Sequence, residues 1–550
     1  MKIKKILENR IFALIVCVIF VGLAALYYYG LQCEYPPEGE VIMSISSMYA
    51  HLTMGKDYTI HEFLYALCSF VATKIGGMSF FSVRLFLSIL YTILLCFTMF
   101  LCLKSKTREG INLYLLPLVA LFSVILFSTV DNPEWVQDPG GKDFLYVWPF
   151  HYHYTSRIYA LVCLALTMLV FQYQGKKRRI VYSVLLAAVC IYAAKTTDLI
   201  FYISFLAPAA IVTMLYIVRK TESRKYIVYL ACGGMGILFL TKVLPFTVFD
   251  RFWSKEKTSV YSAIYGNSNW ISPDALFDHL SGYVEINLLN FNIPIAETPV
   301  ISFNSVIFGL KIVILLVGYI LMFHIIICYF TGKNADYRYD CVDAILAWSY
   351  LLISFVFIFT DLGTVRNSRY FSEMTTIMTV LLCRNIEVFP NIVHINIFNE
   401  IKYKKALFFA FTFVICVCTM SKVWKHRAPD EFGADLEAII EYIDDTGYGY
   451  AVAPYWFYPL VSAMSDGKVM AFETENQIKS MYGDDAKAAY IITWNYNNEE
   501  DDYWSKVFIS TYKHCGSYEE ICEYYSEPTD IIFYDDLQLV VFEDGIEFRE

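Results

Sequence analysis

Charged residues are scarce in this sequence of 550 residues. Asp, Glu, Lys and Arg make up 17% of it, whereas 57% is hydrophobic and the mean hydropathy is +0.47. Soluble globular domains carry about 25% charged residues, so this composition excludes a soluble protein. The sequence also lacks a phosphate-binding loop, a serine-nucleophile motif and paired Cys-x-x-Cys motifs, which removes the common soluble enzyme classes. Most of its 15 cysteines lie in apolar runs, where cysteine behaves as a small hydrophobic residue.

Long hydrophobic runs take the place of the missing charge. Most of them extend over about 18 to 25 residues, enough for a helix to cross about 30 Å of hydrocarbon. We therefore predict a polytopic α-helical membrane protein with about 11 transmembrane helices. The expected spans are 11–31, 80–103, 111–130, 157–174, 180–194, 199–218, 226–246, 304–330, 341–360, 370–384 and 406–423.

Lys and Arg residues are divided unequally between the two sets of loops. One set, which includes the N-terminus, holds 21 of them, and the other set holds about nine. Short cytoplasmic loops retain Lys and Arg, so we expect a multi-pass protein of the cell membrane with a cytoplasmic N-terminus and an extracytoplasmic C-terminus. The basic residues before the first run would also fit a signal peptide, but no small-x-small cleavage site follows that run.

The C-terminal part has the opposite charge. Residues 1–423, the expected membrane domain, carry a net charge of +9, while residues 424–550 contain 8 Lys and Arg against 27 Asp and Glu. Apolar residues at helical spacing between Asp435 and Asp445 predict a helix. Four segments rich in β-branched and aromatic residues predict strands, namely 448–456, 488–496, 530–536 and 537–543. We expect a small acidic α/β domain outside the cell, with a surface unsuited to nucleic acid or anionic lipid headgroups.

The expected external loops of the membrane domain include 32–79, 131–156 and 247–303. The first of them is too long for a simple turn. Its segments 42–54 and 60–74 have apolar residues at helical spacing, which predicts two helices along the membrane surface.

Acidic residues open two of these loops. Glu40 follows the first span, and Asp131 and Glu134 follow the third. Two carboxylates facing one cavity can hold a divalent cation, or one can accept a proton while the other positions the cation. His151 and His153, later in the second loop, are candidate third ligands. The alternative interpretation is that these side chains are solvated at helix ends.

Basic residues stand where the predicted orientation disfavours them. Arg366 and Arg369 come at the start of the tenth span, on the expected outer side. A guanidinium group matches phosphate oxygens with a planar fork of donors, so these residues are candidates to bind a lipid phosphate. Lys195 and Arg157 are weaker candidates of the same kind. Snorkelling toward lipid headgroups is the alternative.

Several short motifs resemble the GT-C superfamily of membrane glycosyltransferases. "GEVIMSISSMY" resembles the acidic motif of the first external loop in bacterial members, with Glu40 at its glutamate. "SRYFSEMTTIMTVLL", which begins at Ser368, resembles the Arg-Tyr motif that opens a late span. Residues 447–472 are similar to outer-domain sequences of uncharacterised bacterial members. The chain departs from the motif at Gly39, where a paired acid is expected.

The resemblance implies a fold, a reaction and partners. It implies a GT-C-like membrane domain with an extracytoplasmic α/β domain, in a bacterial cell envelope. It implies an inverting glycosyltransferase that moves a sugar from a polyprenyl-phosphate carrier in the lipid bilayer to a cell-envelope acceptor. No nucleic acid partner is expected.

The resemblance also implies residue roles. Glu40 would be the base, with Asp131 and Glu134 as supporting acids, and Arg369, Arg366 and Lys195 would bind the donor phosphate. The expected sugar-side residues are Trp135, Trp148, His151, His153 and Tyr370. A divalent metal cation held by Glu40 and Asp131 is the implied cofactor, helpful but not obligatory because phosphate is already a good leaving group.

Two other functions remain open from the sequence. A transporter or flippase of a lipid-linked substrate predicts ionisable residues near the bilayer midplane, whereas Lys311 and Asp343 are expected near span ends. A non-catalytic GT-C-like surface protein would bind a partner through its acidic outer domain.

Overall fold

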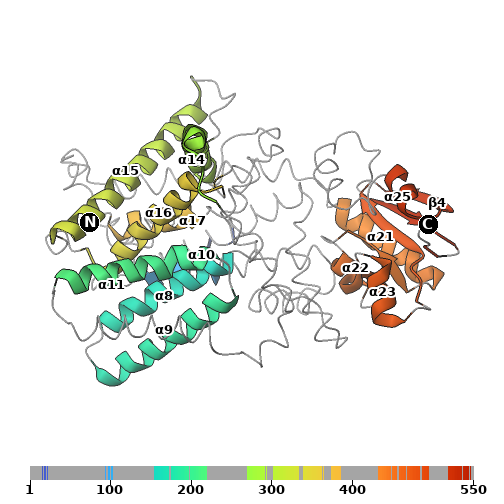
Figure 1. Ribbon diagram of the computed structural model, residues 1–550, viewed down its shortest axis with the longest axis horizontal. Coiled ribbons are helices and arrows are strands. Elements are labelled where there is room, and N and C mark those ends of the chain that lie inside the picture. Colours follow the sequence, from blue (N-terminus) through green and yellow to red (C-terminus); the bar gives the residue numbers. More distant parts are fainter. Residues whose placement is uncertain are drawn as a thin grey trace. The chain divides into compact units, whose positions relative to one another are not determined.

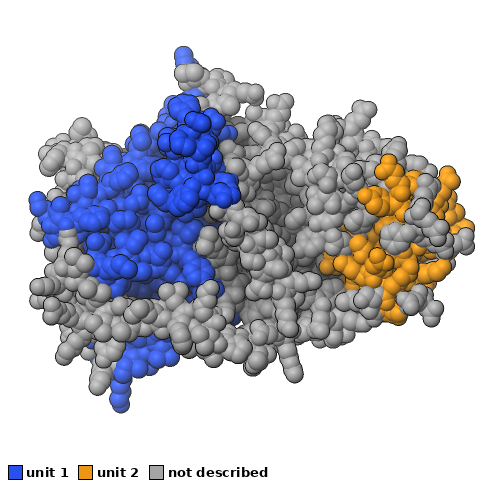
Figure 2. Space-filling view, in the orientation of Figure 1, with its two compact units in different colours: residues 1–28, 89–246, 255–425 blue, residues 29–88, 247–254, 426–550 orange. Residues whose placement is uncertain are grey.

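The computed structural model covers residues 1–550. It describes scattered positions between 15 and 102 and, with short gaps, the stretches 154–219, 269–293, 301–361, 373–385, 431–494 and 518–546. The chain divides into two compact units, which Figure 2 colours separately. Unit 1 consists of residues 1–28, 89–246 and 255–425, and unit 2 of residues 29–88, 247–254 and 426–550.

The described part of unit 1 consists mainly of helices (Figure 1). They are α8 (Tyr154–Gln172), α9 (Lys176–Thr196), α10 (Leu199–Phe201), the π turn η2 (Tyr202–Leu206), α11 (Ala207–Arg219), the 3-10 turn η3 (Pro273–Ala275), α14 (Leu276–Asn290), α15 (Phe303–Thr331), α16 (Cys341–Phe359) and α17 (Glu373–Arg384).

Apart from η3 and α14, these helices coincide with six of the expected spans. Their ends differ from the predicted bounds by at most four residues, the largest difference being at the start of α9. The other five expected spans lie wholly or largely outside the described residues, so the total of about 11 stays a prediction. Among the described helices, two are long and apolar enough to cross a membrane, Ser305–Thr331 and Cys341–Phe359.

The two long apolar helices have well-formed ends. Ser302 precedes α15, and its hydroxyl accepts a hydrogen bond from Ser305 N at 3.1 Å, which satisfies one orphan donor of the first turn. Gly332 ends α15 in the left-handed conformation with a φ of 78°. Asp340 precedes α16 and forms a reciprocal capping box with Asp343.

A π turn interrupts the helix between Leu199 and Arg219, and Pro208 explains it. Proline has no backbone N–H, so the carbonyl of Ser204 loses its ordinary helical donor. The N–H of Ala207 bonds to Tyr202 O, five residues back, which is the π pattern. The hydroxyl of Ser349, from α16, lies 2.5 Å from Ser204 O and 2.7 Å from Ile345 O of its own helix, so its single proton can be donated to Ser204 O in place of the missing N–H.

Unit 2 contains a five-stranded mixed sheet with the order β2-β1-β3-β5-β4 (Figure 1). The strands are β1 (Tyr450–Val452), β2 (Met470–Phe472), β3 (Tyr490–Trp494), β4 (Asp530–Phe533) and β5 (Leu537–Val541). β1 pairs in parallel with β2 and β3, while β5 runs antiparallel to β3 and β4. Four of these strands lie in the predicted segments, and β2 is an additional one.

Helices cover both faces of this sheet. One apolar core joins the sheet to α21 (Glu431–Thr446) and α22 (Tyr458–Met464), and the other joins it to α23 (Glu475–Tyr482) and α25 (Tyr518–Tyr524). The predicted helix at 435–445 is α21, and the next residue after it is Gly447, whose φ is 75°. The small α/β domain expected from the sequence is therefore present.

Candidate functional site

The sequence-predicted site residues lie almost entirely outside the described residues. The base candidate, the supporting acids, the two arginines and the aromatic and histidine residues are in this group: Glu40, Asp131, Glu134, Trp135, Trp148, His151, His153, Arg366, Arg369 and Tyr370. Lys195 lies in the last turn of α9. Their convergence on one site therefore stays a prediction.

Two described residues next to these predicted positions are buried. Arg157, in the first turn of α8, is 2% exposed, so it does not reach out to solvent as a snorkelling arginine would. Glu373, the first residue of α17 and four positions after Arg369, is 3% exposed. Charged groups at the starts of α8 and α17 are thus turned into unit 1.

The loop 247–303 contains a helix that the sequence analysis missed. Three contacts pair this helix, α14, with α16 in antiparallel order. His279 Nδ1 lies 3.4 Å from Phe357 O, and Tyr283 Oη lies 2.6 Å from Ser354 Oγ. Farther along, Tyr350 Oη donates to Asn287 Oδ1 at 2.7 Å. α14 therefore descends from the end of α16 near Phe357 to its middle.

A polar network joins α14 to α15 and α16 inside unit 1. The hydroxyl groups of Tyr283 and Tyr319 are 2.6 Å apart, and Tyr319 Oη donates to Asn287 Oδ1 at 3.0 Å. Tyr350 adds a second donor to the same oxygen and is 0% exposed. Each buried polar group of this network has a partner, as an apolar interior requires. The network can hold α14 in one position.

The surface of α14 that faces away from this network is divided into two stripes. Phe277, Leu280 and Val284 form an exposed apolar stripe. The side chains of Asp278, Ser281 and Glu285 are also exposed and stand one position farther along the chain. At 100° per residue, the acidic stripe therefore lies beside the apolar one rather than behind it.

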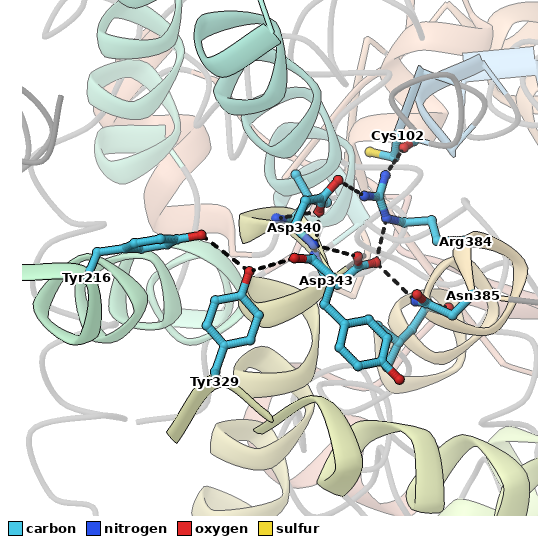
Figure 3. A network of polar contacts seen from close by, with 10 residues as sticks. Cys102, Tyr216, Tyr329, Asp340, Asp343, Arg384 and Asn385 are labelled. Carbon is cyan, nitrogen blue, oxygen red and sulfur yellow. Dashed lines mark hydrogen bonds and ion pairs between the residues drawn. The ribbon is translucent and has the colours of Figure 1, made fainter. Parts of the chain in front are cut away.

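A separate ionic cluster fixes the opposite end of α16 (Figure 3). Arg384 is the last residue of α17. It lies between Asp340, which precedes α16, and Asp343 in the first turn of α16. Its Nη2 is 2.6 Å from Asp340 Oδ2 and its Nε is 2.9 Å from Asp343 Oδ1. Its Nη1 donates to Cys102 O, and Asn385 Nδ2 donates to Asp343 Oδ1 at 3.0 Å. The side chains of Arg384 and Asp343 are fully buried, so this cluster ties helix ends together rather than facing a substrate.

The cluster corrects one detail of the charge count. Arg384 is among the 21 basic residues assigned to the predicted cytoplasmic loops, yet it is paired inside unit 1. Asp343 lies near a helix end, as expected. In the part of the chain that the structure describes, no group of three or more His, Cys, Asp or Glu side chains could hold a metal ion. The predicted cation ligands Glu40 and Asp131 are outside that part.

Comparisons with known proteins give a structural likeness. No protein-family model matches the chain, and no curated protein matches it. Among solved structures, the chain is similar to the Archaeoglobus fulgidus oligosaccharyltransferase, crystallised in complex with Zn and sulfate. The match has 13% sequence identity and a TM-score of 0.47, and it covers 98% of this chain and 72% of that chain.

Proposed function

We propose that this protein is an integral membrane glycosyltransferase that moves a sugar from a polyprenyl-phosphate carrier to a cell-envelope acceptor at the outer face of the membrane. The observation that carries the proposal is the placement of opposite charges on one predicted side. Carboxylates follow the first and third expected spans, and Arg366 and Arg369 directly precede α17. A transferase of this kind needs both, a base for the acceptor and positive charge for the departing phosphate.

The described part of unit 1 supports a polar site on that side. α14 belongs to the predicted external loop 247–303 and exposes Asp278 and Glu285. The end of α14 lies against the first turn of α17, where Thr375 Oγ1 donates to Asn290 O at 3.0 Å. The chain segment with the two arginines therefore leads directly into a helix that contacts α14.

The proposed reaction is a single displacement with inversion. The acceptor hydroxyl attacks the anomeric carbon on the face opposite the phosphate, and the bond from that carbon to the phosphate oxygen breaks with its electron pair. Glu40 takes the proton of the attacking hydroxyl, with Asp131 and Glu134 in support. Arg369 and Arg366, with Lys195, stabilise the charge on the leaving phosphate. A divalent cation, when bound, would be held by Glu40 and Asp131 and would add positive charge.

The remaining predicted residues position the sugar. Trp135 and Trp148 offer aromatic faces that pack on the C–H surface of a pyranose ring. The polar groups of His151, His153 and Tyr370 would bind its hydroxyls. The polyprenyl tail stays in the bilayer, so the carrier approaches from the lipid.

A transfer assay in membranes tests this proposal. With a polyprenyl-phosphate sugar as donor, Glu40→Gln should abolish transfer and leave carrier binding intact, because the amide is nearly isosteric but cannot accept the proton. Arg369→Ala should weaken carrier binding, because its phosphate contact exists in both the ground state and the transition state. Glu38→Gln is the matched control and should have a small effect. Near-normal transfer by Glu40→Gln would move the base to Asp131 or Glu134.

The same assay separates the alternatives. If the wild-type protein and the variants of Glu40, Asp131 and Glu134 all bind the carrier but transfer no sugar, the chain is a binding protein on a glycosyltransferase-like scaffold. Movement of the intact carrier across the bilayer without sugar transfer would indicate a flippase. Both outcomes contradict the proposed reaction.

A further inference from the structure

The depth of α14 beside α16 follows from their three contacts. α16 has 19 residues and is therefore about 28 Å long, close to the thickness of a bilayer core. α14 meets it at Phe357 near one end and at Tyr350 in the middle. In the predicted orientation the end at Phe357 is the outer one. α14 thus reaches from the outer side to about the middle of α16, a helix that is long and apolar enough to span a membrane.

The last turn of α14 is capped inside unit 1 rather than in water. A helix end leaves four carbonyl groups without helical donors, and in a bilayer such groups must be satisfied by protein. Asn287 O accepts from Phe291 N at 3.2 Å, and Leu288 O accepts from Ile293 N at 2.9 Å. Asn290 O accepts from Thr375 Oγ1, as described above. The two residues that follow this end, Phe291 and Ile293, are 0% and 1% exposed.

The neighbouring helices expose apolar side chains as α14 does. α15 exposes Val306, Val313 and Leu316 along its length, and α16 exposes Phe355 near its outer end. Trp270, just before α14, packs edge to face on Phe355 with ring centroids 6.0 Å apart. An apolar surface on two helices that can span a membrane faces lipid, and the stripe of α14 belongs to the same kind of surface.

We propose that α14 is a re-entrant helix of the outer leaflet. It enters the membrane from the outer side, ends at mid-depth against α16 and α17, and lays Phe277, Leu280 and Val284 against lipid acyl chains. The acidic stripe beside them faces water, because an exposed carboxylate such as Glu285 is too costly in hydrocarbon. α14 therefore presents one stripe to the bilayer and the neighbouring stripe to water. The inference rests on the membrane location of unit 1 in the proposed function.

Fluorescence quenching in the reconstituted full chain tests this arrangement. A fluorescent amino acid is placed singly at 277, 280, 284, 281 and 285, all exposed positions, and thermal unfolding confirms that each labelled protein is folded. Lipids with a nitroxide on the acyl chain should reduce fluorescence at 277, 280 and 284. Added iodide should instead reduce it at 281 and 285. The ratio of quenching by a deep nitroxide to quenching by a shallow one should rise from 277 to 284, since seven residues advance about 10 Å along the helix.

A label at Val313, on the exposed face of α15 and nearer the middle of that helix, is the matched control. Lipid quenching at 313 but not at 277, 280 and 284 overturns the proposal for α14 alone. Equal depth at 277 and 284 also overturns it, because the helix would then lie flat on the surface. Fluorescence at 285 that is quenched by lipid and unaffected by iodide overturns the water-facing stripe. Absence of lipid quenching at 313 itself contradicts the membrane location on which the proposed function depends, and the inference falls with it.

Discussion

At the scale of single residues, two buried polar groups of unit 1 are paired across helices. Ser349 reaches the carbonyl that Pro208 leaves without a donor, and Asn287 receives two tyrosine hydroxyls. An unsatisfied polar group costs more in an apolar interior than a satisfied one contributes, so these pairs determine where the helices can lie.

We predict that Ser349→Ala lowers the free energy of unfolding by about 1 to 3 kcal/mol, the cost of a buried carbonyl without a donor. In a Pro208→Ala background the new N–H of residue 208 can serve Ser204 O, so the same substitution should cost less. A double-mutant cycle of thermal unfolding in detergent measures the difference. Equal costs in both backgrounds would show that the Ser349 hydroxyl does not replace the missing helical donor.

The buried ionic cluster leads to a second residue-scale prediction. Arg384→Met leaves the fully buried Asp343 without its opposite charge, and breaking such a pair costs about 3 to 5 kcal/mol. Combining it with Asp343→Asn removes the orphaned charge and should restore part of the lost thermal stability. Transfer activity per folded molecule should change little, because the cluster does not face the proposed site. A double variant less stable than Arg384→Met alone would contradict this account.

At the scale of elements, small residues decide how closely helices approach. α15 contains two glycines in similar sequence surroundings but in different packing. A Cβ at Gly318 would collide with the side chain of Met378 on α17, whereas a Cβ at Gly309 would meet nothing within 4 Å. The close contact between α15 and α17 therefore depends on Gly318.

Gly318→Ala should destabilise unit 1 by about 1 to 3 kcal/mol through overpacking. The loss is smaller if the side chain of Met378 can move away from the added methyl group. Gly309→Ala, the matched control, should be neutral or slightly stabilising, since alanine favours the helix. Met378→Ala should relieve the effect of Gly318→Ala. The measurement is thermal unfolding of the four variants, and equal losses from the two glycine substitutions would show that helix contact is not the cause.

The sequence predicted elements best where one physical requirement dominates. Six described helical segments match expected spans because each is a long apolar run, and four strands match because their segments are rich in branched and aromatic residues. α14 was missed because Asp278, His279 and Glu285 interrupt its apolar residues. The strand β2 was missed, although β1 is equally short and lies in a predicted segment. Its place is fixed by pairing with β1, which no local pattern reveals.

At the scale of the whole molecule, charge is divided between the basic residues 1–423 and the acidic residues 424–550. The orientation inferred from this division places residues 424–550 outside and the loop at 175–179 inside. We predict that an impermeant maleimide labels Glu441→Cys in intact cells, since Glu441 is exposed on α21. Lys177→Cys, exposed at the start of α9, should react only after the cells are opened.

Wild-type protein is the baseline in this experiment because the chain has native thiols. The cysteines that the structure describes are buried, apart from the partly exposed free thiol of Cys522. The reverse pattern, with Lys177→Cys labelled in intact cells and Glu441→Cys protected, would invert the orientation. It would also remove the outer-face site from the proposed function.

The sequence by itself determined the positions of most described helices and the α/β character of the C-terminal domain. These properties follow from composition and short-range periodicity, which neighbouring residues set. Only the tertiary structure decided that a helix of the loop 247–303 lies along α16, that Ser349 completes the π turn and that Arg384 pairs inside the bundle. Each of these contacts joins residues more than 40 positions apart. Their energies depend on burial and partner geometry, which exist only after the chain has folded.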